Sequence, residues 1–102
     1  MYRMIRTATV KTASKGAAAM QCAGEIAAYL NKTYSLNMKF GMEIFGAGKI
    51  HWHLETDSLD KITAMNAKMM QDREYQALLK NGEGQDLWLE GSLKDTLVAI
   101  VG

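Results

Sequence analysis

Two histidines and a glutamate form the most suggestive chemical pattern in the sequence. His51 and His53 are two residues apart in an alternating stretch, so on a β-strand both imidazoles point to the same side. A three-residue loop at residues 46–48 places Glu43 opposite His51 and Gly41 opposite His53. Two imidazoles and a carboxylate can bind a divalent metal, or act as a base and an orienting group in proton transfer. They can equally be a structural pair in which Glu43 accepts a hydrogen bond from His51.

Trp88 and Glu90 extend this candidate site. They alternate with Leu87 and Leu89 in a predicted strand, so we expect them to face the same side as the histidines. The candidate ligand-binding residues are therefore Glu43, His51, His53, Trp88 and Glu90. The candidate metal ligands are Glu43, His51 and His53, although we expect no metal or other cofactor. No catalytic residue is assigned, and whether the protein is an enzyme stays open.

Four further features have simpler interpretations. Arg6 could anchor an anion if it shares the histidine face, or it could be a surface or salt-bridged arginine, and the pattern around it does not decide its face. Cys22 is the only cysteine and is expected to be a small buried hydrophobe. One cysteine cannot form an intrachain disulfide or a thiolate zinc cluster, which suits a reducing cytoplasm. The methionines are expected to fill the core, and Tyr75 to anchor a short helix against the sheet.

Strands and helices must position these residues, and the sequence pattern predicts their order. Runs rich in β-branched or alternating residues predict strands, and apolar positions at helical spacing predict helices. A break in the apolar stripe near Asp72 predicts a short separate helix at the end of the second one. The predicted segments are a strand at 2–11, a helix at 17–30, a hairpin at 38–45 and 49–55, a helix capped by Asp57 and Ser58, a short helix at 73–80, a strand at 87–93 and an apolar tail at 96–101.

The hairpin register follows from its apolar residues. Pairing Ile44 with Ile50, Met42 with Trp52 and Phe40 with Leu54 keeps one face apolar, whereas a slip of one residue mixes apolar with polar side chains on both faces. We expect the helices to cover this apolar row, which also includes Met38.

The element order predicts an α+β, ferredoxin-like βαββαβ fold, with an antiparallel sheet, both helices on one face and a single domain over residues 1–102. The other sheet face is too apolar for a fully wet surface and too polar for a core. A second copy packed against it would enclose a mixed-polarity cavity, and the apolar tail could pair across that dimer. We therefore expect a homodimer with a small-molecule ligand, and the alternative is a monomer with a wet sheet face.

Composition excludes several partners. The 102 residues are 48% hydrophobic and 23% charged with a formal net charge of +1, and no basic run could neutralise several phosphates. The stretch KIHWHLE offers one tryptophan, on the helix-facing side, where an RNA-recognition strand needs paired aromatics. No stretch approaches the roughly 20 apolar residues that span a bilayer. We expect no nucleic-acid or membrane partner, and a soluble, unprocessed cytoplasmic protein.

A resemblance to a known superfamily rests on three features, which are the element order, the hairpin GMEIFGAGKIHWHLE and the segment AKMMQDREYQALLKNG. The chain resembles the dimeric α/β barrel superfamily, particularly its small NIPSNAP-like and uncharacterised stress-type members, over nearly its whole length. That superfamily includes cofactor-free monooxygenases, haem-binding and haem-degrading enzymes, and isomerases of small unsaturated acids. Its pockets lie between the sheet and the helices or within the barrel. Because each branch uses different residues, the resemblance transfers no catalytic residue to this chain.

Two functional hypotheses follow from these observations. The first is a homodimer that binds a small molecule in a mixed-polarity cavity, with cofactor-independent monooxygenase-like or isomerase-like activity as one form of it. The second is a non-catalytic dimeric structural or interaction protein whose polar sheet face sets the register of its partner.

Overall fold

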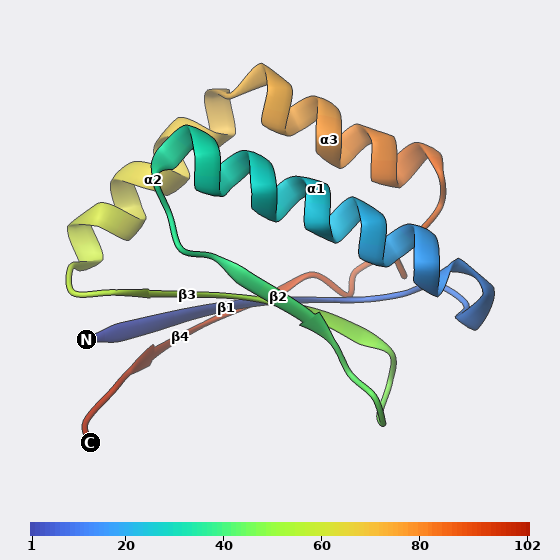
Figure 1. Cartoon of the computed structure of the whole chain (residues 1–102), viewed down its shortest axis with the longest axis horizontal. Coiled ribbons are helices and arrows are strands. Elements are labelled where there is room, and N and C mark those ends of the chain that lie inside the picture. Colours follow the sequence, from blue (N-terminus) through green and yellow to red (C-terminus); the bar gives the residue numbers. More distant parts are fainter.

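The computed structural model describes residues 1 to 102 and consists of two layers (Figure 1). All helices lie on one face of an antiparallel four-stranded sheet, whose strands have the order β2-β3-β1-β4. The elements along the chain are β1 (Tyr2–Thr9), a short 3-10 helix η1 (Ala13–Lys15), α1 (Gly16–Tyr34), β2 (Lys39–Met42), β3 (Lys49–Thr56), α2 (Leu59–Gln71), α3 (Arg73–Gly84) and β4 (Lys94–Ala99). This is the ferredoxin-like α+β fold that the pattern predicts.

The core lies between the helices and the sheet. Helix α1 buries a face made mostly of small residues, with Ala19, Cys22, Ala23, Ile26, Ala27 and Leu30. Small side chains let the helix axis approach the sheet closely, and the indole Nε1 of Trp52 donates a hydrogen bond to the carbonyl of Ala23 at 3.3 Å. Strand β3 alternates as predicted, with Ile50, Trp52 and Leu54 buried beneath the helices. Cys22 is a buried free thiol, as expected.

The hairpin register differs from the prediction by two residues. Phe40 pairs with Trp52 and Met42 with Ile50, because the turn closes early, where the carboxylate of Glu43 accepts a hydrogen bond from the backbone N–H of Lys49 at 3.1 Å. The backbone N–H of Glu43 also donates to the Lys49 carbonyl at 2.9 Å. The turn needs glycine at position 48, where φ is 74°.

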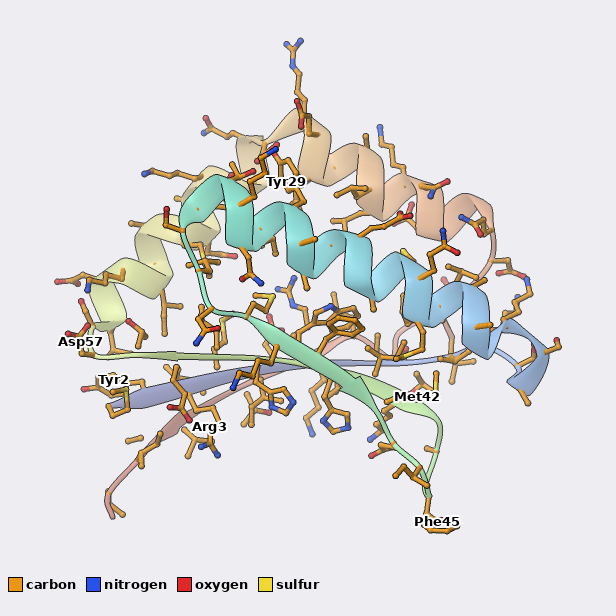
Figure 2. The ribbon with its side chains drawn as sticks, viewed as in Figure 1. Tyr2, Arg3, Tyr29, Met42, Phe45 and Asp57 are labelled. Carbon is orange, nitrogen blue, oxygen red and sulfur yellow. The ribbon has the colours of Figure 1, made fainter.

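This shift keeps every side chain on its predicted face but removes two residues from the sheet. Ile44, which was expected in the apolar row, and its neighbour Phe45 now lie in the loop and are 90% and 93% exposed. Figure 2 shows Phe45 at the tip of the hairpin, pointing away from the helices. The hairpin therefore ends in an exposed apolar tip.

The prediction of a strand at 87–93 was wrong. Only Trp88 makes a bridge, to Val10, and the chain then turns at Gly91, where φ is 75°. The Ser92 hydroxyl stabilises this turn by donating a hydrogen bond to the Leu89 carbonyl at 2.6 Å. It also accepts a hydrogen bond from the Thr9 backbone N–H at 3.0 Å, so that N–H is not available to extend the strand pairing with residues 87–93. The fourth strand is instead β4, so the apolar tail pairs with β1 of its own chain.

The predicted break between α2 and α3 is present. Ser58 accepts from the Lys61 N–H at the start of α2, and Asp72 accepts from the Tyr75 N–H at the start of α3. The same carboxylate accepts hydrogen bonds from the hydroxyls of Tyr29 and Tyr34, which tie the junction to α1. None of the helices combines the length and apolar character needed to cross a membrane.

Candidate ligand-binding cavity

A cavity of about 800 Å³ lies between the sheet and the helices. Strand β1 and Trp52 form one side of it, α2 and α3 contribute Met65, Met69 and Tyr75, and the turn at residues 89–93 also lines it. Most of the lining is apolar, and the volume lies within the range of about 300–1,000 Å³ typical of small-molecule sites. The layer between sheet and helices can therefore hold a ligand.

Three polar side chains meet at the wall of this cavity. Arg6 and Asp95 are directly opposite each other in the β1–β4 pairing, and both line the cavity on the helix side. The guanidinium of Arg6 donates to both carboxylate oxygens of Asp95, from Nε at 2.7 Å and from Nη2 at 2.9 Å. Its Nη1 donates to the hydroxyl oxygen of Tyr75 at 3.2 Å. Arg6 is thus salt-bridged and lies on the face away from the histidines.

The charges of this group are set by its own contacts. The hydrogen bond to Asp95 raises the pKa of Arg6, and the same contact lowers the pKa of Asp95. Burial raises the pKa of Tyr75, although the nearby Arg6 opposes this shift. At neutral pH the cavity wall therefore holds an ionised Arg6–Asp95 pair beside a neutral phenol.

Trp88 and Glu90 belong to this cavity and do not lie beside the histidines, which corrects the sequence-based placement. Because residues 87–93 are not a strand, the alternation that put both side chains on the open sheet face does not apply. The ring of Trp88 packs against that of Trp52 at a centroid distance of 5.8 Å, tilted by 57°. Glu90 is exposed and contributes to the cavity lining.

Glu43, His51 and His53 come together on the opposite, open face of the sheet. His51 Nε2 lies 3.2 Å from Glu43 Oε2, and the two imidazole rings stack at 6.0 Å. Glu43 reaches His51 diagonally, since Gly41 is the residue opposite His51 and Lys39 the one opposite His53. The hydrogen bond from the Lys49 backbone N–H lowers the pKa of Glu43 most, and the hydrogen bond with His51 lowers it further.

The geometry of this histidine cluster does not make a metal centre. The structure contains no group of three His, Cys, Asp or Glu side chains arranged to hold a metal ion. The His51–Glu43 hydrogen bond matches the structural pair that the sequence left open as one interpretation.

Two residues of the cavity wall were missed by sequence reasoning as site residues. Tyr75 was expected only to anchor α3, and Asp95 was not considered. The available signal was the alternation of β4, in which Asp95 and Leu97 share a face, but its pairing with Arg6 depends on a strand whose limits the sequence pattern misplaced.

Comparison with known proteins gives structural neighbours. No protein-family model matches the chain, and no curated protein matches it in sequence. An uncharacterised NIPSNAP domain protein from Burkholderia xenovorans superposes with a TM-score of 0.78 at 14% identity, covering 99% of this chain and 95% of that one. A NIPSNAP family protein from Agrobacterium tumefaciens gives 0.78 at 14% identity, covering 98% and 92%.

A third neighbour belongs to a different group. A candidate antibiotic biosynthesis monooxygenase from Deinococcus radiodurans gives a TM-score of 0.72 at 14% identity, covering 100% of this chain and 94% of that one. At such low identity these likenesses show the fold. They confirm the resemblance to NIPSNAP-like proteins noted from the sequence, within a ferredoxin-like class that also includes monooxygenase-like proteins.

Proposed function

We propose that the protein binds a small, mostly apolar molecule in the cavity between its sheet and its helices. The observation that carries the proposal is the cavity itself, about 800 Å³ of mainly apolar space with Arg6, Asp95 and Tyr75 grouped at its wall. A space of this volume with a mostly apolar lining and a few polar groups close together is typical of small-molecule sites. The candidate monooxygenase among the structural neighbours supports oxidative chemistry as the enzymatic form of this proposal, and the resemblance noted from the sequence suggests that it would be cofactor-independent.

A fluorescent probe tests binding directly. N-phenyl-1-naphthylamine is neutral and becomes brighter in apolar surroundings, so we expect saturable enhancement with the wild-type protein. Ile62→Trp adds a large side chain to the cavity lining and should raise the dissociation constant by at least about ten-fold, a loss of about 1.4 kcal/mol. Leu59→Trp on the same helix is the control, because Leu59 is exposed and does not line the cavity. No saturable binding, or equal dissociation constants for the two variants, would refute the proposal.

We further infer that two chains associate through their open sheet faces. This face carries the partly buried His51 and His53 next to Ile5, and it is bounded by the exposed apolar tip of the hairpin. It also carries charges of both signs, including the Arg3–Glu55 pair at 2.6 Å. Helices cover only the other face, and a two-fold symmetric dimer would pack this partly apolar surface against an identical one.

Sedimentation over a dilution series tests the association. Ile5→Lys places a charge in the centre of the open face and should weaken the dimer by at least about ten-fold. Met70→Lys, at an exposed position on α2, should leave the dimer unchanged. A wild-type protein that is monomeric at all concentrations would contradict the inference. A dimer that forms while no probe enters the cavity would favour the alternative, a non-catalytic interaction protein.

A further inference from the structure

We infer that the cavity selects uncharged ligands that carry a carbonyl-type hydrogen-bond acceptor, and that the hydroxyl of Tyr75 is the group that recognises it. This inference deepens the proposed function and rests on it. The donors and acceptors that the cavity wall leaves available determine the chemical class of the ligand.

Tyr75 uses only part of its hydrogen-bonding capacity within the protein. A phenol has one O–H donor and an oxygen that accepts. The Tyr75 oxygen accepts from Arg6 Nη1 at 3.2 Å, and this is the hydroxyl's one hydrogen bond in the structure. Its O–H hydrogen therefore has no acceptor from the protein, although Tyr75 is only 5% exposed and lines the cavity. A ligand acceptor next to this hydroxyl would satisfy a donor that is otherwise costly to bury.

Arg6 leaves Tyr75 able to donate to a ligand but not to accept from one. A guanidinium is always protonated in proteins and has only donors. Arg6 is held by two hydrogen bonds to Asp95, at 2.7 and 2.9 Å, so it stays in place and keeps occupying the acceptor side of Tyr75. Burial also keeps the phenol neutral by raising its pKa. Tyr75 therefore presents a hydrogen to the cavity.

The charges around the cavity favour a neutral ligand. Asp95 neutralises Arg6, so the cavity has no free cation to hold a carboxylate. Glu83 and Glu90 also line it, and their negative charges disfavour an anion. The apolar walls, including Met4, Met69 and Trp52, favour a hydrophobic body. A neutral ketone, aldehyde or ester on an apolar scaffold fits these conditions.

A pair of isosteric probes tests this selection. 2-Acetylnaphthalene carries a carbonyl oxygen where 2-isopropenylnaphthalene carries a CH2 group, and each is measured by displacement of N-phenyl-1-naphthylamine. Tyr75→Phe should lower the ratio of ketone affinity to hydrocarbon affinity by about five-fold, because one neutral hydrogen bond usually contributes about this factor to an equilibrium constant. Tyr29→Phe is the control, since the Tyr29 hydroxyl bonds Asp72 and does not line the cavity. It should leave the ratio unchanged.

An infrared measurement on the wild-type protein makes the test independent of how well the variant folds. The carbonyl stretch of the bound ketone should lie at a lower wavenumber than in cyclohexane. A stretch at the cyclohexane position, or an equal affinity ratio in wild type and Tyr75→Phe, would overturn the inference while leaving the proposed function standing. Failure of the ketone to displace bound N-phenyl-1-naphthylamine would overturn the inference alone, whereas absence of saturable N-phenyl-1-naphthylamine binding would overturn the proposed function as well.

Discussion

One carboxylate, that of Asp72, joins three helices. It accepts hydrogen bonds from the hydroxyl of Tyr34 at 2.6 Å, from the hydroxyl of Tyr29 at 2.7 Å and from the backbone N–H of Tyr75 at 3.1 Å. These bonds lower the pKa of Asp72, with Tyr34 as the largest cause, and the same contact raises the pKa of Tyr34 to about 12. The folded state therefore favours an ionised Asp72 beside two neutral phenols.

This cluster predicts a specific dependence of stability on pH. Because the folded pKa of Asp72 lies below the unfolded value of about 3.9, its contribution is present above that pH and is lost as the pH falls through the folded pKa. Asp72→Asn should lower the melting temperature at pH 7 and reduce the further loss between pH 5 and pH 2. Thermal unfolding across this range measures both effects. Asp60→Asn, which makes no side-chain hydrogen bond, should keep the wild-type slope, and a wild-type slope in Asp72→Asn would contradict the prediction.

At the scale of elements, Gly82 sets how closely α3 approaches α1. A Cβ atom at this position would lie 2.9 Å from Trp88 Nε1 and 3.1 Å from Cys22 Sγ. Gly82 and Cys22 are buried and Trp88 is partly buried, so an added Cβ atom would crowd side chains that are packed against the core. The contact between α1 and α3 and the position of the Trp88 ring therefore depend on the missing side chain.

Gly82→Ala has two opposing effects on stability, a gain in helix propensity and a loss from crowding at this contact. Alanine gains about 1 kcal/mol in a helix, whereas overpacking a core costs about 1–3 kcal/mol, so we expect a net loss of about 1 kcal/mol. That corresponds to a melting temperature lower by about 4–8 °C. Gly84→Ala is the matched control, because its Cβ would meet nothing within 4 Å. Urea unfolding of both variants measures the difference, and equal stabilities would show that the close approach is unimportant.

At the scale of the molecule, local patterns predicted the element order, the faces of β3 and the break at Asp72. They did not predict the hairpin register. Alternation has a period of two, so a shift of two residues leaves every side chain on the same face, and apolar pairing cannot distinguish the two registers. In the register that forms, the Glu43 carboxylate accepts a hydrogen bond from the Lys49 N–H, a contact within the turn that the apolar pairing does not encode.

The candidate site was less predictable for a related reason. The sequence brought Glu43, His51 and His53 together correctly, because they lie on one hairpin. It could not show the cavity, which is a space left between packed layers. It also could not join Arg6 to Asp95, 89 residues apart, while the tail was expected to pair with another chain. Sites built from distant elements depend on the register of the strands that connect them.

The pairing of β1 with β4 has a consequence for the order of folding. Tyr2 pairs with Ala99, so the inner strand receives its second neighbour from the other end of the sequence, across a loop of almost the whole chain. Closing so long a loop costs entropy that nearby contacts do not, which favours late docking of β4. Asp95 reaches Arg6 only in that step. An intermediate with β1, β3 and α1 already packed would thus have most of the hydrophobic core but not yet the polar wall of the cavity.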